Sequence, residues 1–113
     1  MKKIKKFATI DIGSNAIRLL ISNIYTINSK TFTTKNSLLR VPVRLGQDAF
    51  KEGKISKINI TRLVDSMKSF KLIMKVHSIE KYLAYATSAL RSSSNGELIV
   101  NEILNKTGLR VEI

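Results

Sequence analysis

The stretch that decides the fold lies at residues 10–20 and reads IDIGSNAIRLL. An apolar segment carries one acid, Asp11, into a Gly-Ser-Asn turn at residues 13–15, and a second apolar segment carrying Arg18 follows at once. So short a connection between two apolar segments predicts an antiparallel β-hairpin. Backbone N–H groups, a hydroxyl, an amide and a guanidinium around one turn suit a phosphate, and a neighbouring carboxylate suits a magnesium ion.

Composition limits the chemistry that the chain can perform. The 113 residues are 43% hydrophobic and 25% charged, which is ordinary for a globular domain, and they are enough to bury a core. The absence of cysteine excludes disulfides, thiolate zinc sites and cysteine nucleophiles. A single histidine, His77, argues against a histidine-rich metal site or a Ser-His-Asp triad. We expect one domain, spanning residues 1–113.

The formal net charge of +12 favours polyanionic partners such as polyphosphate, nucleotides, nucleic acid or an anionic membrane. The lysines are spread along the chain, apart from four that precede the first predicted strand, so a merely lysine-rich composition is the alternative. The basic start does not read as a signal peptide, because Asp11 and Arg18 interrupt the apolar run that follows it. No apolar run is long enough to span a membrane, and we expect a cytoplasmic protein.

Periodicity predicts three strands, then helices alternating with strands. The strands fall at residues 7–12, 16–25, 30–45, 81–87 and 109–113, and the helices follow Ser56 and Ser94. The third strand is interrupted near Asn36, and Pro42 places its end at a sheet edge or a bend. The order β-β-β-α-β-α-β, with a mixed sheet flanked by helices, is that of an α/β half-domain of the ribonuclease-H-like class, which includes actin, hexokinase and Hsp70.

Two helices are expected from caps and apolar stripes. Ser56 caps a helix ending near His77, whose apolar stripe is Ile60, Leu63, Met67, Phe70 and Met74. Ser94 and Glu97 form a capping-box pattern for a second helix that ends before Gly108. Its buried side is expected to hold Leu98, Ile99, Ile103 and Leu104. Residues 46–53 and 88–95 are expected to be loops.

Asp11 is the strongest candidate for a metal ligand. A carboxylate within a buried strand is costly unless it is paired or coordinated, and its position lets it point toward the turn. Gly13, Ser14, Asn15 and Arg18 are the phosphate-binding candidates around that turn. The alternatives are a plain hairpin turn, in which Gly and Asn supply positive φ angles, and a solvated strand arginine.

A second group of candidates follows the predicted strand at residues 81–87. Thr87, Ser88 and Arg91 are placed where open α/β sheets bind ligands, outside the carboxyl ends of strands. The alternative is an ordinary hydroxyl-rich loop. Arg44 either supports the same cleft or is a surface arginine. His77 is expected only to face the carboxyl end of its helix.

These segments together resemble the exopolyphosphatase and guanosine pentaphosphate phosphatase (Ppx/GppA) family. The resemblance rests on DIGSNAIRLL at residues 11–20, PVRLG at 42–46 continued by GKIS at 53–56, and ATSALR at 86–91 continued by SNGE at 94–97. It covers about residues 7–113. The first motif is shared with sugar kinases and Hsp70-like ATPases, whereas the three in this order are specific.

The resemblance implies hydrolysis of a terminal phosphoanhydride in polyphosphate or guanosine pentaphosphate, with Mg²⁺ or another divalent cation. Asp11 would hold the metal. Phosphate would lie against Gly13, Ser14, Asn15, Arg18, Thr87, Ser88 and Arg91. Ala16 replaces a frequent Ser or Thr. A full-length member of the family can form a homodimer.

The family's catalytic glutamate is expected beyond Ile113, so no catalytic residue is assigned here, and we expect this chain to be an amino-terminal subdomain with little turnover alone. The alternative is a non-catalytic module that binds polyphosphate or nucleotides. A nucleic-acid partner is not expected, because only the charge supports it and no recognition motif or aromatic platform is evident.

Overall fold

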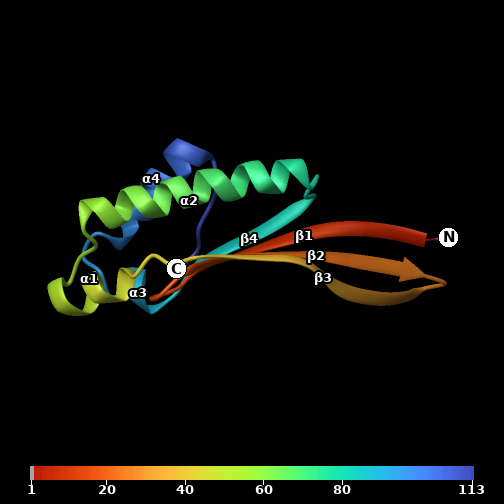
Figure 1. Cartoon of the computed structure of the whole chain (residues 1–113), viewed down its shortest axis with the longest axis horizontal. Coiled ribbons are helices and arrows are strands. Elements are labelled where there is room, and N and C mark those ends of the chain that lie inside the picture. The colour runs from red at the N-terminus through yellow and green to blue at the C-terminus, as the bar shows by residue number, and fades with distance from the viewer. Residues whose placement is uncertain (1) are drawn as a thin grey trace.

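The computed structural model describes residues 2–113, with only the backbone considered at positions 2, 3, 36 and 37 (Figure 1). The elements in chain order are β1 Lys2–Ile12, β2 Ile17–Ile27, β3 Lys30–Val41, α1 Leu45–Glu52, α2 Lys57–Val76, β4 Lys81–Ala86, α3 Ser88–Arg91 and α4 Gly96–Thr107.

The four strands form one mixed sheet in the order β3-β2-β1-β4. β2 is antiparallel to both β1 and β3, and β4 is parallel to β1. The predicted strand at 109–113 is reduced to a single parallel bridge between Tyr85 and Glu112. In that bridge the Glu112 N–H donates to the Ala84 carbonyl at 2.9 Å, and the Ala86 N–H donates to the Glu112 carbonyl at 2.7 Å.

β3 is the edge strand, and its irregularities match the sequence. Ile21 pairs with Ser37 and Ser22 pairs with Lys35, so Asn36 is the extra residue of a β-bulge. Pro42 follows the last residue of the strand, as its missing N–H requires. Asn28 and Ser29 make the two-residue β2–β3 turn with φ angles of 49° and 68°, which suits the twist of a hairpin.

The core lies between one face of the sheet and α2 and α4, which cover that face (Figure 1). Alternate residues of each strand point into it, including Ile10 and Ile12 of β1, Leu19 and Ile21 of β2, and Ala84 of β4. The residues between them, such as Asp11 and Arg18, belong to the opposite face.

α2 forms as its sequence predicts. Ser56 is the N-cap, and its side chain accepts a hydrogen bond from the Asn59 N–H at 3.4 Å. Leu63, Met67, Phe70 and Met74 of the predicted stripe are buried, and Ile60 is half-buried. His77 is the C-cap, as expected.

Three predictions about the loops and the second helix are wrong. Residues 46–53 are not a loop, because Leu45–Glu52 form α1, with Gly53 as a left-handed C-cap at φ 73°. Residues 88–95 contain the short helix α3. α4 begins at Gly96 rather than after Ser94, and Asn95 hydrogen-bonds Ile55 instead of capping.

These corrections share one physical reason, which is that tertiary packing overrides local preference in short elements. α1 carries a glycine in its first turn but buries Leu45 and Ala49, one helical turn apart. α4 buries Ile99 and Ile103 as expected, whereas Leu98 is 70% exposed and Leu104 is half-buried. The apolar stripe of α4 is therefore narrower than the sequence predicts.

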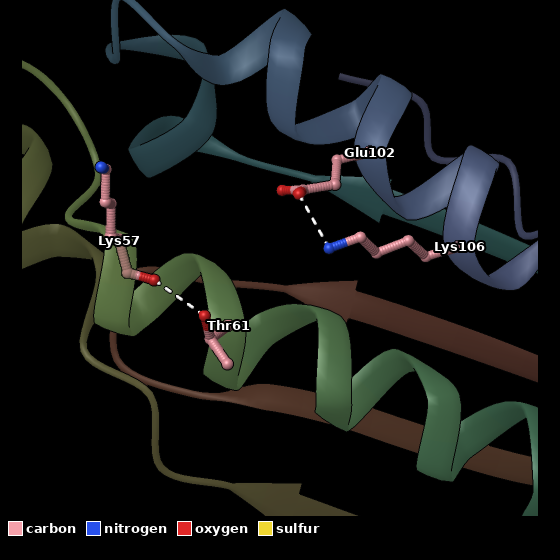
Figure 2. Close-up of polar contacts among 4 residues, drawn as sticks. All are labelled: Lys57, Thr61, Glu102 and Lys106. Atoms are coloured by element: carbon pink, nitrogen blue, oxygen red, sulfur yellow. Dashed lines mark hydrogen bonds and ion pairs between the residues drawn. The ribbon is translucent and has the colours of Figure 1, made fainter.

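Figure 2 shows one polar contact within α2 and one within α4. Thr61 Oγ1 donates to the Lys57 carbonyl at 3.1 Å, and Lys106 Nζ lies 3.1 Å from Glu102 Oε1. The exposed ion pair contributes little to stability. One lysine does connect the two helices, because Lys71 Nζ donates to the Thr107 carbonyl.

Candidate functional site

The turn between β1 and β2 is compact and is closed by one backbone hydrogen bond. The Gly13 N–H donates to the Ala16 carbonyl at 3.0 Å. No residue of this turn has a positive φ, so the alternative in which Gly13 and Asn15 supply left-handed geometry is wrong. Gly13 is needed for space instead, because a Cβ there would lie 3.1 Å from the Ala16 oxygen.

Asp11 lies directly beside this turn. A Cβ on Gly13 would lie 3.9 Å from Asp11 Oδ1, and this oxygen is shielded from solvent without a hydrogen-bond partner among the described residues. A buried carboxylate oxygen without a donor is costly, and a cation would compensate that cost. The oxygen is therefore free to ligate a hard cation such as Mg²⁺.

No group of three or more acidic or histidine side chains within the described part of the chain could hold a metal ion. A cation at Asp11 would thus have one protein carboxylate and would take its other ligands from water or from substrate phosphate. That mixture is typical of Mg²⁺, which keeps several waters and is bound through one or two carboxylates.

Three chain segments meet at Ser14. Its carbonyl accepts from the Gly46 N–H at 2.8 Å, which attaches the start of α1 to the turn. Its hydroxyl lies 3.2 Å from the Ser88 hydroxyl at the start of α3. The Thr87 N–H donates to the Ile12 carbonyl at 3.2 Å, so the structure brings Ser14, Thr87 and Ser88 together as predicted.

Gly46 is a residue of this region whose importance the sequence analysis missed. A Cβ at Gly46 would lie 3.0 Å from Ser14 Cβ and 3.2 Å from the Ser14 oxygen, so only glycine lets α1 approach the turn this closely. The signal in the sequence was the four-residue spacing of Leu45 and Ala49 before Gly53, which marks one buried helical turn with a glycine C-cap.

The open face of the sheet adds charge beside the turn. Asp11, Arg18 and Arg40 occupy one row across β1, β2 and β3. Both arginines are exposed, and like charges directly opposite each other on neighbouring strands repel. A bound anion would relieve that repulsion, and Arg40 therefore joins Arg18 as a candidate ligand, which only the strand register reveals.

The side chains of the remaining predicted residues make no hydrogen bond or ion pair with the turn within the described part of the chain. Asn15 is exposed at the tip of the turn, and Thr87 is half-buried before α3. Arg91 is exposed in the last turn of α3, and Arg44 is exposed at the N-cap of α1. Their roles in binding stay predictions.

A hydrogen-bond cluster holds α1 in place from its far side. Asp48 Oδ2 accepts from the Ser56 N–H at 2.9 Å, the Ser56 hydroxyl at 2.7 Å and Asn59 Nδ2 at 2.8 Å. The bond from the Ser56 hydroxyl, followed by that from its N–H, lowers the pKa of the Asp48 carboxyl; burial opposes this shift, and the bond from Asn59 adds the weakest lowering contribution. The charged carboxylate thus joins α1 to the start of α2.

The sheet order and the turn after β1 define the class of the protein. Three antiparallel strands followed by a parallel β4, with helices packed on the sheet, make an α/β half-domain of the ribonuclease-H-like class, as predicted. The particular family follows from direct comparison. The sequence profile of the Ppx/GppA phosphatase family matches residues 24–113, and the chain belongs to that family.

Relatives and solved structures agree with this assignment. The chain is 31% identical over 108 residues to a bifunctional 3-dehydroquinate synthase/phosphatase of Fusobacterium nucleatum, covering 92% of this chain and 16% of that protein. It is 26% identical over 108 residues to exopolyphosphatase 1 of Mycobacterium leprae, covering 96% of this chain and 31% of that protein. The crystal structure of the Aquifex aeolicus Ppx/GppA family member superposes with a TM-score of 0.87 at 26% identity, covering 97% of this chain and 35% of that one.

The chain thus spans about a third or less of the length of these proteins. Within residues 2–113, no helix is both long and apolar enough to cross a bilayer.

Proposed function

We propose that this chain supplies the first phosphate-binding loop of a hydrolase that releases the terminal phosphate of inorganic polyphosphate or guanosine pentaphosphate. The observation that carries the proposal is the pairing of the turn where the hydroxyls of Ser14 and Ser88 meet with the shielded Oδ1 of Asp11, which has no hydrogen-bond partner among the described residues. Membership of a phosphatase family supports the same chemistry. The cytoplasm stays the predicted location, and the homodimer stays a prediction for the full-length protein.

The proposed division of labour follows from the position of each residue. Gly13, Ser14 and Asn15 of the turn bind phosphate, and the Ser88 hydroxyl adds a second hydroxyl beside that of Ser14. Arg18 pairs with phosphate oxygens on the open face of the sheet. Thr87 and Arg91 would bind phosphate from the side of α3. Mg²⁺ at Asp11 would neutralise charge on the phosphate oxygens, which is the main contribution that proteins make to phosphoryl transfer.

Phosphate release tests the reaction. The full-length protein containing this chain, given Mg²⁺, is expected to release phosphate from polyphosphate, from guanosine pentaphosphate or from both. Asp11→Asn keeps the shape of the side chain and is expected to lower kcat at least about tenfold, because one charged ligand is lost. Asp65→Asn, at an exposed position of α2, is the matched control. Release from neither substrate, or equal rates for the two variants, would contradict the proposal.

The alternative is a module that binds polyphosphate without cleaving it, and the net charge of +12 is the observation that favours it. Both functions predict salt-sensitive polyphosphate binding by the 113-residue chain. Arg18→Ala and Arg91→Ala should each weaken that binding about five- to tenfold, whereas Arg62→Ala on α2 should not. Tight binding by the full-length protein without phosphate release would favour the alternative.

A further inference from the structure

The outer parts of β1, β2 and β3 extend past the helices as a three-stranded projection (Figure 1). We define this basic arm as residues 2–6 and 23–35. It contains six lysines and no aspartate or glutamate. Among the lysines whose side chains the structure describes, Lys5, Lys30 and Lys35 are exposed and Lys6 is half-buried. The arm therefore has a strong positive charge that no acid of its own offsets.

An apolar row crosses the arm on the face that carries the helices farther along the sheet. Strand register places Ile4 opposite Tyr25, and Tyr25 opposite Phe32. Phe32 is 51% exposed and Ile4 is 48% exposed, because α2 ends before it reaches them. Asn23 Nδ2 donates to the Tyr25 hydroxyl at 3.3 Å, which helps to fix the ring on the strand.

Polar and basic rows flank this apolar row on the same face. Toward the helices, Lys6, Asn23 and Thr34 form the next row. Toward the tip, Ile27 pairs with Lys30. A strand surface with aromatic rings in the middle and ammonium groups at its margins combines the two features that bind single strands, which are base stacking and attraction of the phosphate backbone.

We propose that the basic arm binds single-stranded nucleic acid, with bases stacked on Phe32 and Tyr25 and phosphates held by the surrounding lysines. This departs from the expectation drawn from sequence, in which only the net charge pointed to nucleic acid. The register supplies the missing aromatic surface, since the two rings are seven residues apart in the chain but are direct neighbours across β2 and β3.

Charge and shape favour this occupant over three others. A second copy of the arm would bring two sets of lysines together, and like charges disfavour such pairing. A membrane-inserting hairpin would lead with apolar side chains, whereas the arm ends in Asn28, Ser29 and Lys30. Polyphosphate satisfies the lysines but has no base to cover Phe32.

Fluorescence anisotropy of the 113-residue chain with a labelled 12-nucleotide oligouridine tests the stacking. Phe32→Leu keeps an apolar side chain but removes the ring, and it is expected to weaken binding about five- to fiftyfold. Phe50→Leu is the matched control, because Phe50 is 62% exposed on α1, near the turn at Ser14. Circular dichroism checks that both variants fold.

The lysines are tested by the salt dependence of the same binding. Replacing Lys6 and Lys30, which flank the apolar row on its own face, with Gln should lower the slope of log K against log salt by about 1.4, at about 0.7 for each phosphate contact to a single strand. The double variant Lys51→Gln and Lys54→Gln, at the end of α1, removes equal charge and should leave the slope unchanged.

Competition experiments distinguish the occupants. Binding of Phe32→Leu equal to wild type, with polyphosphate of equal charge competing fully, would overturn the proposal in favour of a general polyanion surface. A loss confined to Phe50→Leu would place the nucleic acid at the 13–16 turn and would also overturn it. Phe32-dependent binding to phosphatidylglycerol vesicles, without binding to oligouridine, would assign the arm to a membrane. The phosphate-release assay is independent of all three outcomes, because Phe32 lies outside the turn.

Discussion

Inward- and outward-facing residues alternate along the whole of β1 and β2. The inner halves of these strands, near the 13–16 turn, are nevertheless covered by helices, whereas the outer halves, in the basic arm, are exposed. In the inner half, Ala8, Ile10 and Ile12 alternate with polar residues and are buried beneath the helices. In the outer half, Ile4 belongs to the same face but is about half exposed. Alternation thus decides which face a side chain occupies, whereas the reach of α2 decides whether that face is buried.

The two halves also differ in charge. The outer half carries the arm lysines, and the inner half ends at the turn with a single acid, Asp11. A charge is tolerated easily where water reaches it, whereas a carboxylate next to a packed turn needs a partner. This difference is why we propose different ligands for the two ends of the same hairpin, phosphate with a cation at one end and a nucleic-acid strand at the other.

The largest expected effect is on stability, and it is measured by comparing a phenylalanine packed beneath the helices with one in the basic arm. Phe70 of α2 is 1% exposed, and Phe70→Ala should cost about 3–5 kcal/mol of unfolding free energy, because it removes a buried ring and leaves a cavity. Phe32→Ala in the arm should change stability by no more than about 0.5 kcal/mol. Urea denaturation followed by circular dichroism measures both. Similar losses would show that the arm is packed as tightly as the helix-covered body.

The next effect tests close packing within the body. A Cβ at Gly96 would lie 2.2 Å from the Leu90 oxygen, so Gly96→Ala must push α4 away from α3 and should cost about 3 kcal/mol. Gly53→Ala is the control, because nothing lies within 4 Å of its Cβ and only its φ of 73° is unfavourable. That variant should cost about 1 kcal/mol. Equal costs in thermal or urea unfolding would mean that α4 relaxes freely.

A smaller effect concerns the cluster that holds α1. The pKa of Asp48 is lower in the folded protein than in the unfolded chain, so its carboxylate stabilises the fold at neutral pH. This contribution is lost as the pH falls below about 4, toward the folded pKa. Asp48→Asn should cost about 1 kcal/mol at pH 7 and nothing at the acid end of the window.

Unfolding free energies of wild type and Asp48→Asn across pH 2–7 measure the difference. Asp65→Asn is the control, because Asp65 is exposed on α2 and its replacement should leave the unfolding free energy unchanged. A constant gap between wild type and Asp48→Asn over the whole range would show that charge plays no part.

The smallest expected effect is the hydroxyl contact between Ser14 and Ser88. A double-mutant cycle with Ser14→Ala and Ser88→Ala should give a coupling of about 0.5 kcal/mol, because both groups are half-buried and neutral. Zero coupling would mean that water replaces the contact, and that this hydroxyl pair adds nothing to the backbone bond from the Thr87 N–H to the Ile12 carbonyl.

The sequence predicted the parts of the fold that depend on regular patterns. The hairpin at residues 10–20, α2 with its Ser56 cap, the bulge near Asn36 and the glycine stop at Gly108 are confirmed. Each follows from local chemistry, such as alternation, capping or the missing N–H of proline. α1, α3 and the start of α4 were missed, because short helices depend on packing partners that lie far away in the chain.

For the candidate site, residue types alone indicated Asp11 and the hydroxyls of Ser14 and Ser88. A carboxylate within an apolar strand, or a hydroxyl at a strand end, favours a binding role. Tertiary structure decided which of them meet, because the Ser14–Ser88 contact joins residues 74 positions apart. It also added Gly46, Arg40 and the Ile4–Tyr25–Phe32 row, whose roles depend on strand register and on the close approach of helices. The sequence by itself therefore determined the faces and the chemistry of this protein, whereas packing alone decided which faces are covered and which residues share a site.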